Sequence, residues 1–133
     1  MKTIMRIAIL IVVVAGINFT NVFGQQADAP KLYAVVFHAD YCSACKAIGP
    51  TVMALKENLN DQEVEFVKID LTSDESKSKS EEIAKNLGLS KIIESNKGTG
   101  YVVLVDAKTK EKKGVLTGKQ SSEEMLATVD KLL

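Results

Sequence analysis

The chain has 133 residues, of which 46% are hydrophobic, and its 17 basic side chains balance 17 acidic ones. A chain of this length fits a single domain with one hydrophobic core. The balanced charge argues against nucleic-acid binding, because phosphate contacts need clustered Lys and Arg in excess over acidic groups.

The N-terminus has the pattern of a secretory leader. Lys2 and Arg6 precede an unbroken apolar run from Ile7 to Ile17, and more polar residues follow. A basic start, a short apolar core and a small-residue exit predict a signal peptide over residues 1–24, cleaved after Gly24. The alternative is an uncleaved membrane anchor, although a spanning helix needs about 20 apolar residues and the polar residues interrupt this run early. We therefore expect export to the periplasm or the extracellular space.

The remaining chain is expected to hold a short N-terminal segment, residues 25–30, and one domain, residues 31–133. Its strands are predicted from β-branched and aromatic runs, and its helices from apolar residues at helical spacing, capping residues and Gly88. The polar stretch at residues 73–82 is expected to be a loop that leads into the second helix. The elements expected in chain order are a strand at Lys31–Phe37, a helix from Cys42 to about Asn60 with Pro50 inside it, a strand at Glu63–Asp70, a helix at Ser80–Leu87, strands at Tyr101–Val105 and Lys113–Gly118, and a helix after Ser121.

The predicted order β-α-β-α-β-β-α indicates an α/β fold. The right-handed crossover between the first two strands gives parallel pairing, and the last two strands form an antiparallel hairpin. We expect a mixed four-stranded sheet with helices on both faces, which is a three-layer sandwich. In such sheets the chemistry gathers at the carboxyl ends of strands. Phe37 ends the first predicted strand, and Cys42 follows it closely.

Cys42 and Cys45 are the only cysteines of the chain, and His38 is its only histidine. A structural zinc site usually takes four cysteine and histidine ligands, so these three residues cannot complete one in a monomer. A purely structural disulfide would close a very small loop and would stabilise the fold by only about 2 kcal/mol.

The Cys-x-x-Cys spacing fits reversible redox chemistry better than either structural role. Residues i and i+3 are neighbours in the first turn of a helix, where a disulfide can open and close in place. The helix N-terminus favours a thiolate, so Cys42 is predicted to be the nucleophile. Cys45, one turn deeper, is predicted to attack the mixed disulfide and release the partner.

From about Lys31 to Leu133 the chain resembles the thioredoxin superfamily. The stretch "VVFHADYCSACKAIGP" at residues 35–50 is similar to the strand, Cys-x-x-Cys and helix of that family, and "VKID" is similar to its second core strand. The resemblance implies thiol-disulfide oxidoreductase activity without a bound cofactor. The residues that match the family motif are Cys42, Cys45, Lys46 and Pro50.

The sequence departs from the family pattern around this motif. The family usually places a cis-proline opposite the cysteines, and Thr99 and Gly100 are predicted to occupy that place here. Gly100 would still allow a partner backbone to approach closely. The family's buried acid and its lysine partner are replaced by Val36 and Phe66, so the proton of Cys45 must use water or another group. The family's additional first strand and helix are also expected to be missing.

Residues around the cysteines are expected to bind the substrate or tune the thiols. His38, in the place of a bulky aromatic residue, could pack, stabilise the thiolate as a cation, or join both sulfurs in binding a soft metal such as Cu(I). Asp40 and Tyr41 are predicted to form a rim that shapes partner access. Ser43 and Ala44 carry no charge, and the direction of electron flow stays open. The full set of predicted substrate-binding or tuning residues is His38, Tyr41, Ser43, Ala44, Thr99 and Gly100.

The sequence thus predicts a monomeric, exported oxidoreductase that exchanges disulfides with protein partners. Its partners would be protein thiols or disulfides and a membrane electron donor or acceptor. Contact with the membrane itself is expected only through an uncleaved leader. Two alternatives are a soft-metal delivery module that uses Cys42, Cys45 and His38, and a redox-inactive domain that only binds partners.

Overall fold

The computed structural model describes residues 29–59 and 63–133. The predicted signal peptide and most of the segment at residues 25–30 lie outside the described residues. No helix in the described part of the chain is both long enough and apolar enough to cross a membrane. The elements are β1 (Leu32–His38), α1 (Ser43–Asn58), β2 (Val64–Asp70), α2 (Asp74–Asn86), α3 (Ser90–Ser95), β3 (Tyr101–Asp106), β4 (Lys112–Thr117) and α4 (Ser122–Asp130).

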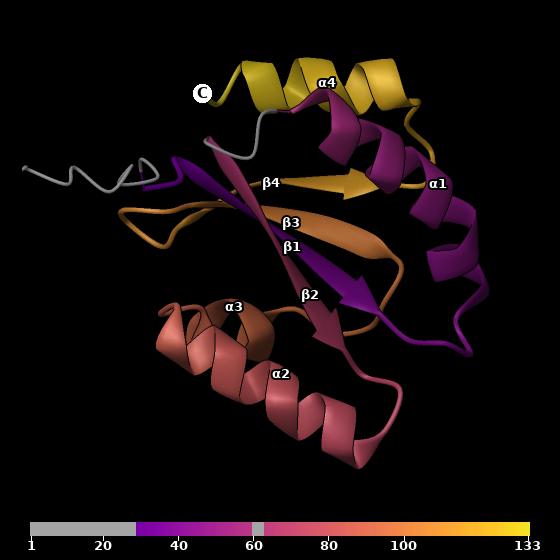
Figure 1. Ribbon diagram of the computed structural model, residues 1–133, viewed down its shortest axis with the longest axis vertical. Coiled ribbons are helices and arrows are strands. Elements are labelled where there is room, and N and C mark those ends of the chain that lie inside the picture. Colours follow the sequence, from indigo (N-terminus) through magenta and orange to yellow (C-terminus); the bar gives the residue numbers. More distant parts are fainter. Residues whose placement is uncertain (1–28, 60–62) are drawn as a thin grey trace, which may run out of the picture.

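The strands form one mixed sheet in the order β2-β1-β3-β4. β1 pairs in parallel with β2, whereas the pairs β1–β3 and β3–β4 are antiparallel. Helices α1 and α4 cover one face of the sheet, and α2 and α3 cover the other (Figure 1). The predicted three-layer architecture, with a parallel crossover and a terminal hairpin, is confirmed.

The side chains of β1 alternate between two hydrophobic clusters, because successive residues of a strand point to opposite faces. Leu32 and Ala34 pack with residues of α1 and α4, such as Ile48 and Met125. Val35 and Phe37 pack in the other cluster, which includes residues of α2 and α3. Burying one such large side chain stabilises a fold by roughly 1.5–3 kcal/mol. The strand that leads into the cysteine motif is therefore fixed from both sides.

Helix α2 begins earlier than the sequence pattern predicted. The stretch at residues 73–82 is not a loop: the helix starts at Asp74, with Ser73 as its N-cap. Ser73 and Ser76 form a capping box, and Lys79 pairs with Glu75 at 2.6 Å one turn away. These local bonds form the helix without an apolar stripe. Its predicted end is close to the observed one, and Gly88 follows at φ +73°.

A further helix, α3, was not predicted. It has only six residues, Ser90–Ser95, and it brings Ile92 into the core under the sheet. The observed order is therefore β-α-β-α-α-β-β-α. The final helix, α4, has the predicted capping box between Ser121 and Glu124.

Candidate active site

The two cysteines lie at the junction between β1 and α1, with Cys42 just before the helix and Cys45 in its first turn. After His38 the chain turns through a backbone hydrogen bond of 3.1 Å, in which the N–H of Cys42 donates to the carbonyl of Ala39. Cys42 is the N-cap residue of α1, and its Sγ accepts a hydrogen bond of 3.1 Å from the backbone N–H of Cys45. The side chain of Cys42 is partly exposed, whereas Cys45 is only 5% exposed.

The two thiols have opposite pKa shifts. The pKa of Cys42 is lowered, mainly by a hydrogen bond from the side chain of Cys45 and next by one from the side chain of Thr99. The pKa of Cys45 is raised, first by burial and then by its hydrogen bond to Cys42. A thiolate at a helix N-cap is also stabilised by unpaired N–H groups. The pair therefore holds one exposed sulfur that ionises easily and one buried sulfur that keeps its proton.

The carbonyl of Phe37 connects the buried cysteine to the loop before β3. The Sγ of Cys45 lies 3.7 Å from this oxygen, at the distance of a weak thiol hydrogen bond. The N–H of Gly100 donates to the same oxygen at 2.8 Å. The carbonyl of Phe37, near the end of β1, thus accepts hydrogen bonds from both the loop before β3 and the thiol of Cys45.

Gly100 brings that loop into contact with the motif. Its φ is +90°, and a Cβ built on it would lie 2.7 Å from the Cβ of Ala44 and 3.4 Å from the Sγ of Cys42. Only glycine allows the backbone to approach this closely. Thr99 precedes it and acts on the pKa values of both cysteines. The structure therefore brings Thr99 and Gly100 beside the cysteines, and the described residues contain no cis peptide bond.

A hydrogen-bonded group that the sequence analysis missed ties the motif loop to the loop after β2. The backbone N–H of Asp40 donates to the Oγ1 of Thr72 at 3.1 Å. Thr72 in turn donates to the Oδ1 of Asp70 from its hydroxyl at 2.5 Å and from its backbone N–H at 3.0 Å. We call this chain of bonds the Thr72 latch.

The Thr72 latch contains a strongly acidic carboxyl group. The bonds from Thr72, followed by the nearby charge of Lys68, lower the pKa of Asp70 to about 2. The only sequence signal for the latch was an Asp and a Thr two residues apart at the end of a strand, which is a local turn pattern. That pattern does not indicate contact with Asp40, which lies 32 residues from Thr72.

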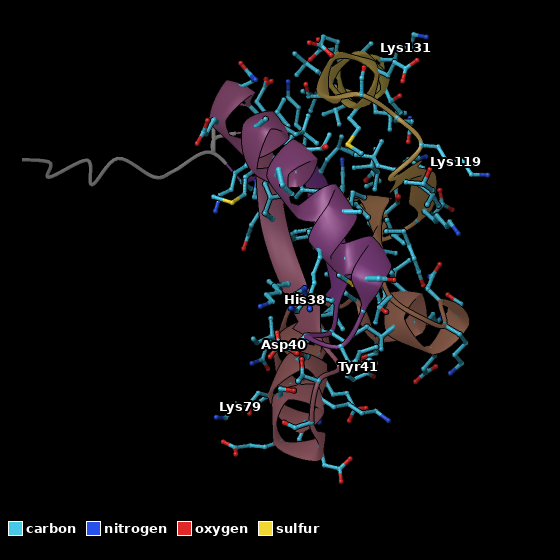
Figure 2. The ribbon with its side chains drawn as sticks, turned by 90° about the vertical axis from the view of Figure 1, so that its right-hand side faces the viewer. His38, Asp40, Tyr41, Lys79, Lys119 and Lys131 are labelled. Atoms are coloured by element: carbon cyan, nitrogen blue, oxygen red, sulfur yellow. The ribbon has the colours of Figure 1, made fainter. Side chains whose placement is uncertain are left out.

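The other predicted site residues surround the start of α1. Figure 2 shows His38, Asp40 and Tyr41 grouped near this end of the helix. The Nε2 of His38 lies 3.0 Å from the Oδ1 of Asp40, so the histidine pairs with the motif loop. The side chain of Tyr41 is 73% exposed, and its hydroxyl donates to the carbonyl of Leu71 at 3.4 Å. Ser43 and Ala44 are exposed beside the cysteines.

The residues considered for a soft-metal site are not arranged as one. Within residues 29–59 and 63–133, no group of three or more His, Cys, Asp and Glu side chains could hold a metal ion. His38 pairs with Asp40, the Sγ of Cys42 accepts the backbone N–H of Cys45, and the Sγ of Cys45 lies beside the carbonyl of Phe37. The arrangement is suited to thiol chemistry between Cys42 and Cys45.

Comparison with protein families gives a match to the thioredoxin family model over residues 11–112. Thioredoxin H2 from Arabidopsis thaliana is 37% identical to the chain over 49 residues, which are 37% of this chain and 35% of that protein. The chain therefore matches about a third of the length of this curated relative.

Solved structures with the same fold confirm the architecture. MTB DsbF, in its mixed oxidised and reduced forms, aligns with a TM-score of 0.53 at 18% identity, over 83% of this chain and 86% of that one. The thioredoxin of Malassezia sympodialis aligns with a TM-score of 0.51 at 21% identity, over the same shares of the two chains. At these identities the likeness establishes the fold alone.

Proposed function

The chain belongs to the thioredoxin family, and on that premise we propose that it is an exported thiol-disulfide oxidoreductase that exchanges disulfides with protein partners through Cys42 and Cys45. One observation carries the proposal: the two sulfurs differ in exposure and in the direction of their pKa shifts. An accessible thiolate can capture a partner, and a buried thiol in the same helical turn can release it.

The reaction begins at the exposed sulfur. The thiolate of Cys42 attacks one sulfur of the partner's disulfide, and a mixed disulfide forms as the partner's S–S bond breaks. The partner's other sulfur leaves as a thiolate and takes a proton from water. Cys45 then loses its proton and attacks the Sγ of Cys42, which forms the internal disulfide and releases the partner's second sulfur as a thiol. Two electrons have passed to the partner, and the reverse sequence oxidises a partner dithiol.

The only charge that acts on the ionisation of Cys45 is that of the Cys42 thiolate. The pKa of Cys45 is set by burial, by Cys42, by the backbone of Ala39 and by the side chain of Thr99, with no acid or amine among these causes. The proton therefore leaves to water or to the departing partner thiolate. Capture of the partner is expected to make the loss of this proton easier, because Cys42 no longer carries the negative charge that raises the pKa of Cys45.

The leader pattern at residues 1–24 supports export to the periplasm or the extracellular space. We expect residues 25–30 to connect this leader to a monomeric domain. In an oxidising compartment the Cys42–Cys45 pair needs a second partner that restores its working redox state. A membrane protein with an exposed dithiol or disulfide would supply this exchange.

The same substitution at each cysteine tests the proposal. In an insulin disulfide reduction assay with a thiol reductant, Cys42→Ser should abolish turnover, because it removes the nucleophile. When it is mixed with insulin in the absence of the thiol reductant, Cys45→Ser should instead accumulate a mixed disulfide between Cys42 and the partner, visible on a non-reducing gel. Turnover that survives Cys42→Ser would reject these roles. A wild-type protein with no turnover would favour the redox-inactive binding domain.

A further inference from the structure

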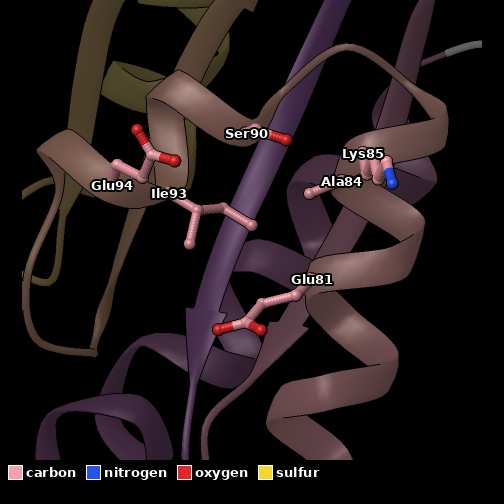
Figure 3. Close-up of a pocket in the computed structure, with 6 residues that line it drawn as sticks. All are labelled: Glu81, Ala84, Lys85, Ser90, Ile93 and Glu94. Carbon is pink, nitrogen blue, oxygen red and sulfur yellow. The ribbon is translucent and has the colours of Figure 1, made fainter.

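A groove runs between α2 and α3 on the face of the sheet opposite α1. Two cavities of about 330 and 210 Å³ form it, and both are lined by Glu81, Ile93 and Glu94. In Figure 3, Glu81 extends from α2 and Ile93 extends from α3 into the space between the two helices. The shared residues make the two cavities one continuous groove, which we call the α2–α3 groove.

The α2–α3 groove reaches the loops that surround the cysteine motif. Its smaller cavity is lined by Phe37, Leu71 and Gly98. Gly98 belongs to the loop in which Gly100 lies against Cys42, and the carbonyl of Leu71 accepts a hydrogen bond from the hydroxyl of Tyr41. A polypeptide chain held at Cys42 can therefore continue along these loops into the groove.

The floor of the groove is apolar near the motif, where Phe37, Leu71 and Ile93 line the smaller cavity. Two of these residues, Leu71 and Ile93, are only partly buried and leave apolar surface at the groove. Such a surface suits an apolar side chain of a partner, because filling it removes apolar area from water.

The charged side chains of the groove are left without partners. Glu81 and Glu94 line both cavities and so lie centrally, whereas Lys77 and Lys97 line only the smaller cavity and Lys85 only the larger. None of these five forms an ion pair with another residue of the described chain. The centre of the groove therefore offers two free carboxylates, which a cationic group complements better than an anionic or neutral one.

We propose that the α2–α3 groove binds the partner polypeptide whose cysteine reacts with Cys42, and that it selects a segment with a basic residue beside an apolar one. The apolar side chain lies on Leu71 and Ile93, and the Arg or Lys lies between Glu81 and Glu94. This inference rests on the proposed function, because the same partner must be held at Cys42.

Peptide probes test the charge preference directly. Each peptide carries one cysteine in a mixed disulfide with a chromophoric aromatic thiol, and the peptides differ only in having Arg, Gln or Glu three, four or five residues from that cysteine, on either side. The rate constant for release of the chromophore by the reduced protein is measured at limiting peptide. At the best position the wild type should prefer Arg over Glu by about tenfold, from two carboxylate contacts at the surface.

Variants assign that preference to the groove. The double substitution Glu81→Gln with Glu94→Gln should reduce the preference to less than about twofold. Glu82→Gln, a matched change at an exposed residue of α2 outside the groove, should retain it. The proposal is overturned if the wild type shows no preference at any position, if the double variant keeps the preference, or if Glu82→Gln loses it equally.

Two further measurements distinguish a failure of the groove proposal from a failure of the proposed function, and distinguish peptide binding from dimerisation through the groove. The bis-aromatic disulfide of the same chromophore needs no groove, so the wild type and the double variant should react with it at the same rate. A wild type that fails to react with it refutes the proposed function itself. A dimer in the wild type that is lost in the double variant would show that a second copy fills the groove, and would overturn the peptide proposal.

Discussion

Replacing Gly100 by alanine tests the contact between the loop before β3 and the cysteine motif. Gly100 has a φ of +90°, a backbone angle that residues other than glycine rarely adopt. An added Cβ would also lie 2.7 Å from the Cβ of Ala44, closer than non-bonded carbons approach. The loop cannot retreat freely, because the N–H of Gly100 donates to the carbonyl of Phe37 at 2.8 Å.

The structure separates two contributions to the loss of stability. Left-handed backbone costs an alanine roughly 1–2 kcal/mol, and the clash with Ala44 adds about 1–3 kcal/mol as an overpacked contact. Gly98 is the matched control, because it also has a φ of +90° but a Cβ there would meet nothing within 4 Å. Gly98→Ala should therefore be destabilised only by the backbone conformation, whereas Gly100→Ala should be destabilised by the backbone conformation and by the clash.

Urea unfolding of the reduced protein measures this difference, and alkylation measures its effect on the site. Gly100→Ala should be less stable than Gly98→Ala by about 1–3 kcal/mol. It should also slow the alkylation of Cys42 near neutral pH, because the displaced loop carries Thr99 away from the sulfur. Equal stabilities and equal alkylation rates for the two variants would refute the described contact.

Two further predictions concern the Thr72 latch. Thr72→Val removes both the acceptor for the N–H of Asp40 and the hydroxyl bond to Asp70, and so loosens the loop that positions Cys42 at the start of α1. We therefore expect a raised pKa of Cys42 and slower alkylation near neutral pH. Thr72→Ser keeps the oxygen and should restore the wild-type rate; identical behaviour of the two variants would contradict a positioning role. The folded-state pKa of Asp70, about 2, lies below its usual value of 3.8, so its stabilisation is present above pH 4 and lost as the pH falls toward 2. Acid unfolding should show a loss on the order of 1 kcal/mol over that window after solvent screening, and an Asp70→Asn variant that kept this pH dependence would assign it to another group.

The layers of the fold and the placement of the cysteines could be predicted, because both follow from strong local patterns. The run at Lys31–Phe37 is apolar on both faces, which specifies an inner strand of a sheet covered by helices. A Cys-x-x-Cys pair directly after such a strand lies at a helix start, and the structure places Cys42 at the N-cap.

The missed features depend on capping or on long-range contact. Helix α2 begins in a polar stretch with no apolar stripe. The sequence feature that marks its start is the pair Ser73 and Ser76, which form the capping box. The six-residue helix α3 is too short for its periodicity to be recognised. The α2–α3 groove requires this helix, so it could not be inferred from the sequence pattern.

The proposed chemistry depends on a difference in ionisation between Cys42 and Cys45, which lie within one helical turn. The most direct measurement is the alkylation rate of each cysteine in the reduced protein as a function of pH, followed by mass spectrometry of the labelled peptides. Cys42 should react first, with a midpoint below that of an ordinary thiol, and Cys45 should react slowly with a midpoint above it. Faster labelling of Cys45, or one ordinary midpoint shared by both cysteines, would contradict the account.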